Sequence, residues 1–150
     1  MTSPNTASRY GLYSVVVMAS TPDERVTAAR IAADLGISEA HVKKVLQQLA
    51  RARLIGATRG ANGGYALVRA ADEMTMLDVV EAIEGTWQSP CAACDLIDAA
   101  DGSCTPHHAA CGVHDVLAEL DRRAFYTMKS VTISTLARRG RRVVRLPRVG

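Results

Sequence analysis

The sequence predicts a mainly α-helical protein with one small β-hairpin, arranged as a winged helix-turn-helix domain followed by a long C-terminal helix. Three observations predict this fold class. Apolar residues recur with a helical period, a glycine-rich hairpin pattern follows two closely spaced helices, and a heptad-like apolar stripe runs through residues 113–128. The chain has 150 residues, 48% of them hydrophobic, but only one Trp and one Phe, so we expect one core of Val, Leu, Ile and Ala.

A helix-turn-helix is predicted in the first third of the chain, after a first helix over residues 10–20. In VTAARIAADLG (26–36), Thr27 can cap the helix start, and the final glycine suits a C-terminal turn. In ISEAHVKKVLQQLARARL (37–54), Ser38 is the candidate N-cap. The apolar stripe of this helix consists of Val42, Val45, Leu46 and Leu49.

The outward face of this last helix is polar and basic, as expected of a helix that enters the major groove of DNA. A hairpin predicted in LIGATRGANGGYALV (54–68) would add Arg59 and Asn62 at its tip, where glycines allow a close approach to the phosphate backbone. Without that hairpin, two amphipathic helices would indicate no more than a helical hairpin with a solvated face. The candidate DNA contacts are Ser38, Ala40, His41, Lys43, Lys44, Gln47, Arg51, Arg59 and Asn62.

Two further helices are predicted, and a short closing one. Thr75 and Asp78 can form a capping box that opens a helix ending at Gly85. GVHDVLAELDRRAFYTMKSV (112–131) is predicted as one helix, and its length favours a dimerisation helix over one packed on its own domain. Thr132 is expected to cap the closing helix. The candidate dimer contacts are Val113, Val116, Leu117, Leu120, Ala124 and Met128.

Charge divides the chain into three parts. Residues 1–69 carry nine Lys/Arg against four Asp/Glu, residues 70–137 carry three against eleven, and residues 138–150 carry six arginines and no acid. A basic first part beside an acidic middle suggests a face for a polyanion. No apolar run approaches the roughly 18 residues of a membrane span, and no signal peptide is recognised. We therefore expect a cytoplasmic protein with no membrane partner.

All four cysteines lie in CAACDLIDAADGSCTPHHAAC (91–111), a polar stretch between two predicted helices. In a cytoplasmic chain, clustered cysteines are more often metal ligands or redox thiols than disulfides. An iron–sulfur cluster, a tetrahedral zinc site and a thiol switch remain open. Trp87 is expected to pack this segment onto the domain. No nucleophile–base pair is recognisable, so an enzyme is not expected. The candidate metal ligands are Cys91, Cys94, Cys104, Cys111 and His114.

The chain is therefore expected to contain four parts: a DNA-binding domain over residues 8–85, a cysteine-rich segment over 86–111, a dimerisation helix and short closing helix over 112–137, and a mobile basic tail over 138–150.

Four stretches of the sequence resemble the family of bacterial winged-helix regulators that includes the iron–sulfur regulator IscR and the nitric-oxide sensor NsrR. They are SRYGLYSVVVMA, ISEAHVKKVLQQLARARLI, RGANGGYALVRAADEMTMLDVVEAIEG and CGVHDVLAELDRRAFYTMKSVTISTLA, and the resemblance covers roughly residues 8–137. It implies a homodimeric transcription regulator, either a repressor or an activator, that binds a pseudo-palindromic site on double-stranded DNA. It also implies a [2Fe–2S] or [4Fe–4S] cluster that senses nitric oxide, redox state or iron supply.

Many members of this family hold the cluster with three cysteines just before the long helix. By position, Cys104 and Cys111 match the second and third, and Cys91 or Cys94 matches the first. The resemblance thus favours an iron–sulfur cluster, with zinc as the alternative cofactor. The alternative function is a zinc- or thiol-based winged-helix regulator, or a protein-interaction module without a cluster.

The fourth ligand is open. In some members, a carboxylate or histidine on the first helix of the partner chain completes the coordination, and the matching positions here hold Arg9 and Tyr13. Neither residue is a usual cluster ligand. The candidates are the extra cysteine, His114, or the pair His107 and His108. The last two are more typical of solvent-exposed loop residues than of metal ligands.

Overall fold

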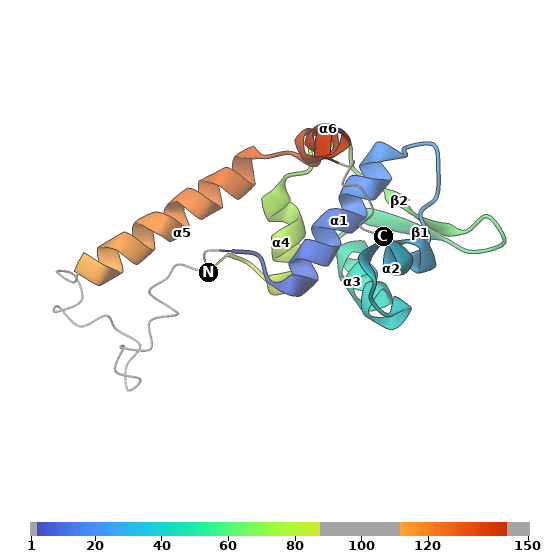
Figure 1. Ribbon diagram of the computed structural model, residues 1–150, viewed down its shortest axis with the longest axis horizontal. Helices are drawn as coiled ribbons and strands as arrows, with labels where there is room; N and C mark the ends of the chain where they lie inside the picture. Colours follow the sequence, from blue (N-terminus) through green and yellow to red (C-terminus); the bar gives the residue numbers. More distant parts are fainter. Residues whose placement is uncertain (1–2, 88–111, 144–150) are drawn as a thin grey trace, which may run out of the picture.

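The computed structural model describes residues 3–87 and 112–143 of the chain. Its elements are α1 (Thr6–Ser20), α2 (Ala28–Leu35), α3 (Glu39–Arg51), β1 (Ile55–Thr58), β2 (Gly64–Leu67), α4 (Met76–Glu84), α5 (Gly112–Ser130) and α6 (Ile133–Val143). A helical body with one two-stranded sheet confirms the predicted fold class. Figure 1 shows α5 projecting from this body as an arm. Within the described ranges, no helix is long and apolar enough to cross a membrane.

The core of the body forms around α1, which lies against α3, α4 and α6 (Figure 1). Close packing of α1 depends on Gly11, because a Cβ atom at this position would collide with the Ile83 side chain of α4. The side chains that are fully buried include Val15, Ile31, Leu46, Leu49, Val79 and Ile133, drawn from five helices. Tight contact among these helices therefore holds the helix-turn-helix on a rigid support.

The helix-turn-helix forms as predicted, and its local signals are confirmed. The Thr27 side chain caps α2 by accepting the Arg30 N–H at 3.2 Å. Gly36 ends α2 in the left-handed region, at φ 64°, where a residue without a Cβ is favoured. Ser38 then caps α3. These three residues set the angle at which α3 leaves α2.

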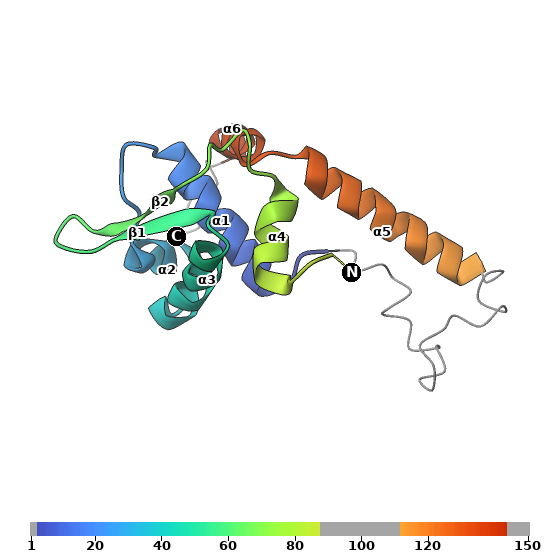
Figure 2. The ribbon, with the colours of Figure 1, turned by 180° about the vertical axis from the view of Figure 1, so that it is seen from behind.

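The wing is an antiparallel hairpin in which Ile55 pairs with Leu67 and Thr58 with Gly64. Its position is set by a second pairing, because Val26 and Tyr65 exchange two backbone hydrogen bonds of 2.9 Å. The wing is thus joined to the segment that leads into α2. Both Figure 1 and Figure 2 show the hairpin extending away from the body beside α2.

The first helix starts earlier than predicted, at Thr6 rather than Tyr10. Its N-cap is Asn5, whose side chain accepts the Ser8 N–H at 2.8 Å. The Asn5 N–H in turn donates to the Glu84 carboxylate at 2.8 Å. The signal for the earlier start is therefore partly supplied by a residue at the far end of α4.

The starts of α4 and α6 agree with the sequence, but α6 is longer than expected. The predicted capping box of α4 is present, with Thr75 and Asp78 each bonded to the other's backbone N–H. Thr132 accepts the Thr135 N–H at the start of α6. Helix α6 continues to Val143, so residues 138–143 are helical rather than part of a mobile tail.

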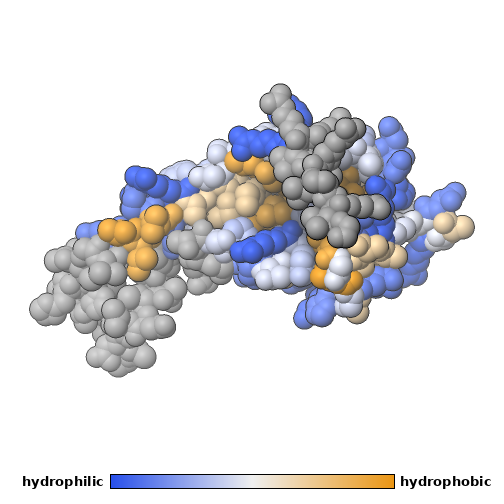
Figure 3. Space-filling view, viewed as in Figure 1, coloured by the Kyte–Doolittle hydropathy of each residue, from blue (hydrophilic) through white to orange (hydrophobic). Residues whose placement is uncertain are grey.

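The long helix α5 is divided into two halves. Its C-terminal half packs on α4, where Met128 is 4% exposed and contacts the cluster of Leu77 and Val80. Its other half exposes Val116, Leu117 and Leu120, which are 48% to 61% exposed. Figure 3 shows apolar surface on this projecting half.

This division corrects the predicted dimer stripe at one end. Met128 is buried within its own chain and so is not exposed to a partner, whereas Ala124 beside it is half-buried and stays a predicted contact. The reason is that the apolar face of α4 packs against the C-terminal end of α5. The Val113 side chain lies outside the described residues.

Candidate nucleic-acid interface

The outward face of α3 is exposed along its length. Four predicted contacts that lie one helical turn apart, Ala40, Lys44, Gln47 and Arg51, are all exposed, whereas the apolar stripe faces the core. In both views α3 lies at the lower edge of the body, α6 lies at its upper edge, and the hairpin extends sideways beside α2 (Figures 1 and 2). Because β1 contacts α3, the helix and the wing form one continuous side of the molecule, away from α6.

The cations on this side differ in their partners. Lys43 forms an ion pair with Glu39 at 2.7 Å, and this hydrogen bond is the main cause that raises the pKa of Lys43. Within the described residues, no acidic side chain pairs with Lys44, Arg51 or Arg59. Unpaired cations on an exposed face attract a polyanion, because little of their charge is neutralised locally.

The N-terminal end of α3 carries a small hydrogen-bonded group. The Ser38 hydroxyl lies 2.7 Å from His41 Nδ1 and also caps the helix. Both side chains are exposed. A helix N-terminus presents unpaired N–H groups and a positive dipole end, which suits contact with phosphate oxygens.

The wing tip holds Arg59 and Asn62 in a tight turn. The Gly63 N–H donates to the Gly60 carbonyl at 2.9 Å and closes this turn. A Cβ at Gly63 would lie 2.5 Å from the Thr58 carbonyl oxygen, which only a glycine avoids. Both polar residues at the tip are exposed.

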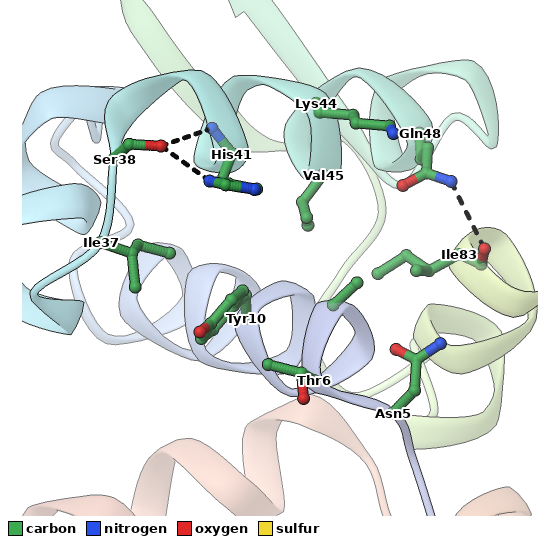
Figure 4. A pocket seen from close by; sticks show the side chains of 11 residues that line it. Asn5, Thr6, Tyr10, Ile37, Ser38, His41, Lys44, Val45, Gln48 and Ile83 are labelled. Carbon is green, nitrogen blue, oxygen red and sulfur yellow. Dashed lines mark hydrogen bonds between the residues drawn. The ribbon is translucent and has the colours of Figure 1, made fainter.

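A groove beside α3 was not predicted from the sequence. It has a volume of about 700 Å³ and lies between the first half of α1, the polar edge of α3 and the end of α4. Figure 4 shows His41 and Val45 of α3 on one side of the groove and Tyr10 of α1 on the other. No local sequence pattern predicts such a groove, because the residues that line it come together only in the folded chain.

Gln48, which follows the predicted contact Gln47 in the sequence, is turned toward α4. Its side-chain amide donates to the Ile83 carbonyl at 3.4 Å, as the dashed line in Figure 4 marks. It therefore belongs to the packing between α3 and α4.

The two positions on α1 that match a partner-chain ligand do not present an anionic donor. The pKa of Tyr13 is raised, first by burial and then by the charge and hydrogen bond of Asp34, so its phenol stays protonated at neutral pH. Arg9 donates to the Pro4 carbonyl at 3.2 Å. Both observations agree with the expectation that neither residue is a usual ligand.

The predicted metal ligands Cys91, Cys94, Cys104 and Cys111 lie outside the described residues, as do His107, His108 and the side chain of His114. In the described part of the chain, no three His, Cys, Asp or Glu side chains are grouped to hold a metal ion. Trp87, which precedes this segment, packs on α5, with its ring centroid 6.1 Å from that of Phe125.

This geometry defines a winged helix-turn-helix DNA-binding protein, and comparison with known proteins names its family. The model of the Rrf2 family, described as iron-dependent transcriptional regulators, matches residues 5–139. The chain therefore belongs to the Rrf2 family. This family model confirms the predicted resemblance to the bacterial winged-helix regulators.

The relatives agree with this family. BadM of Rhodopseudomonas palustris, named as an HTH-type transcriptional regulator, is 38% identical over 126 residues, which is 84% of this chain and 75% of BadM. CymR of B. subtilis, described as its global cysteine regulator, has the same fold with a TM-score of 0.73 at 23% identity, covering 93% of this chain and 98% of CymR. IscR of T. potens gives a TM-score of 0.72 at 19% identity, covering 97% and 93%. The chain is a DNA-binding transcription regulator and not an enzyme.

Proposed function

We propose that this regulator acts as a homodimer that binds a pseudo-palindromic DNA site and is switched by an iron–sulfur cluster held by residues 91–111. The observation that carries the DNA part is the exposed face of α3 and the wing, where Lys44, Arg51 and Arg59 have no acidic partner within the described residues. In this proposal α3 enters the major groove, and Arg59 and Asn62 contact the backbone or the minor groove.

The dimer supplies the spacing of the two recognition helices. A two-fold symmetric pair must place them about 34 Å apart to reach successive half-sites. The projecting half of α5 supports this arrangement, because Val116, Leu117 and Leu120 are exposed there and no described residue covers them. The four-part division of the chain into residues 8–85, 86–111, 112–137 and the tail remains a prediction, except that residues 138–143 belong to α6.

The cluster proposal depends on the donor set and on the family. Four thiols within 21 residues are suited to iron, and thiolates are the usual ligands of iron–sulfur clusters. We propose Cys104 and Cys111 as indispensable ligands, with Cys91 and Cys94 competing for the first position or both serving. A bound cluster supplies a group that reacts with nitric oxide and oxidants, and its presence would favour one conformation of the segment over others.

The experiment combines metal analysis with DNA binding. Protein purified anaerobically, and four reconstituted single Cys→Ala variants, are compared by absorbance, native mass spectrometry, and iron and sulfide content. We expect Cys104→Ala and Cys111→Ala to lose the cluster, and DNA affinity to change with cluster content. Affinity for promoter and random DNA is measured as a function of salt, since phosphate contacts give a steep dependence. Full cluster content in either variant would contradict the ligand assignment.

The second candidate is a zinc- or thiol-based regulator. It is favoured by one observation, namely that four cysteines, two of them in a CxxC pair at 91–94, match the donor set of a tetrahedral zinc site. In the same experiment, zinc without sulfide in the native protein identifies this candidate.

A further inference from the structure

The N-terminus of α1 is capped from outside the helix. In a capping box, the side chain of the residue three positions after the N-cap accepts a hydrogen bond from the backbone N–H of the N-cap residue. In α1 that residue is Ser8, whose side chain does not supply this bond. Instead, Glu84 at the end of α4 accepts the Asn5 N–H at 2.8 Å and the Ser8 hydroxyl at 2.5 Å, both at the same oxygen.

This contact is exposed on the Asn5 side and buried on the Ser8 side. Ser8 is fully buried, and the second carboxylate oxygen of Glu84 is also buried, without a hydrogen-bond partner in the described part of the chain. A carboxylate with an unsatisfied buried oxygen costs stability relative to a fully bonded one. The negative charge is nevertheless favourably placed, because it lies at the positive end of the α1 dipole.

The same end of α4 is also joined to the recognition helix. Gln48 of α3 donates to the carbonyl of Ile83, the residue before Glu84. Figure 4 shows Asn5, Ile83 and Gln48 together at one end of the groove between α1 and α3. One short segment thus contacts both α1 and α3.

The chain that leaves this segment enters the cysteine-rich stretch almost at once. Gly85 has φ 90°, a conformation that glycine adopts readily. The Trp87 N–H donates a hydrogen bond to the Glu81 carboxylate at 2.8 Å. Cys91 follows four residues after Trp87. A displacement of the chain beyond Trp87 would therefore act first on the end of α4.

We propose that Glu84 and Gln48 are positioning residues that couple the segment following α4 to the recognition helix. When Glu84 caps α1 and Gln48 holds Ile83, α1, α3 and α4 move as one unit. When the end of α4 shifts, the cap and the α3 contact are lost together, and the constraint that the end of α4 places on α3 is weakened, while the shared core keeps the helices packed. This inference depends on the proposed function, in which residues 91–111 receive the signal.

The test measures coupling rather than affinity alone. For each protein, the ratio of the dissociation constants for promoter DNA is determined with the anaerobically loaded protein and after chelation of its metal. Allosteric coupling typically changes affinity about 5- to 150-fold. We expect a ratio in this range for the unaltered chain. The ratio should fall below about 2 for Glu84→Ala and for Gln48→Ala. It should be largely preserved for Glu84→Gln, because glutamine keeps an acceptor oxygen.

The matched control is Thr75→Ala. It removes the cap at the opposite end of the same helix α4, so it lowers stability without touching α1 or α3. We expect its melting temperature to fall and its ratio to stay at the unaltered value. If Thr75→Ala reduces the ratio as much as Glu84→Ala does, the effect is general loosening of α4 and the proposal is wrong.

A second measurement does not depend on metal. Hydrogen exchange of the first turn of α1 is expected to accelerate about fivefold in Glu84→Ala, as after the loss of one cap, and to be restored in Glu84→Gln. An unaltered chain that binds DNA equally with and without metal would overturn the proposed function. Unchanged exchange, or a normal ratio in Glu84→Ala, would overturn the coupling role instead.

Discussion

Lys44 and Arg59 lie on two different elements, α3 and the wing, and both are exposed cations without an acidic partner among the described residues. Lys43 is next to Lys44 in the sequence but is held by Glu39 at 2.7 Å. An exposed ion pair of this kind contributes little to stability, yet it does compete with a phosphate for the same ammonium group. Neighbouring lysines are thus expected to contribute unequally to DNA binding.

The residue-scale prediction concerns these side chains. Lys44→Ala and Arg59→Ala should each weaken binding to promoter DNA by about 1–3 kcal/mol, the range for loss of one good contact, without lowering the melting temperature. Lys43→Ala should have a smaller effect, because part of its charge is already neutralised. Fluorescence anisotropy with labelled DNA at fixed salt provides the measurement.

The matched control for these variants is Arg138→Ala. Arg138 is exposed on α6, at the edge of the body opposite α3, so its loss removes the same charge from a surface that the DNA does not reach. Its affinity should stay near that of the unaltered chain. Equal losses in Arg138→Ala and Lys44→Ala would mean that only net charge matters, and would remove the argument for a specific face.

At the scale of elements, the wing depends on its turn. Gly63→Ala would drive a Cβ against the Thr58 and Gly60 carbonyl oxygens, so the turn must open and Arg59 must move. We expect DNA affinity to fall about as far as in Arg59→Ala, while the core, which includes no residue of this turn, keeps the melting temperature nearly unchanged. Ala61→Ser, an exposed change in the same turn, serves as the control. Normal DNA affinity in Gly63→Ala would show that the wing conformation is not needed.

Elements with local signals were predictable from the sequence. The caps Thr27, Ser38 and Thr75 act within three residues of themselves, and local signals placed α2 and α4 nearly to the residue and the end of α3 to within three residues. The start of α1 differs by four residues from the predicted one, although its N-cap Asn5 is a local signal; the additional bond from the Asn5 N–H to Glu84, 79 positions away, is not a local signal. A pairing over that separation leaves no periodic trace in the sequence.

The candidate site shows the same limit. The outward face of α3 followed from a helical period, and the wing tip followed from glycines at fixed positions, so both were foreseen. The groove beside α3 and the turn of Gln48 toward Ile83 were not, since they depend on how α1 and α4 pack against α3. Local patterns therefore predicted which residues face outward but not which elements touch.

At the scale of the whole molecule, α5 is a helix with two different surroundings. Its end near Met128 is covered by α4, whereas its projecting half presents an apolar stripe that is flanked by charged side chains. Among these charged side chains, Glu119 bonds Arg123 at 2.7 Å and Arg122 at 2.8 Å, and the bond to Arg123 is the main cause that lowers the pKa of Glu119. The carboxylate therefore stays ionised at neutral pH, so that these ion pairs form a polar border beside the exposed apolar side chains Val116 and Leu120.

The whole-molecule prediction is that this stripe forms the dimer. Leu117→Glu combined with Leu120→Glu should give monomers in analytical ultracentrifugation, because like charges would face each other across a desolvated seam. The control combines Val68→Glu and Tyr126→Glu, two apolar side chains that are 63% and 60% exposed but lie off the stripe, and it should stay dimeric. Monomers should also bind a full pseudo-palindrome no better than a half-site, since the two recognition helices are no longer linked. A dimer mass retained by the Leu117 and Leu120 variant would place the interface elsewhere and would leave the exposed half of α5 to another partner.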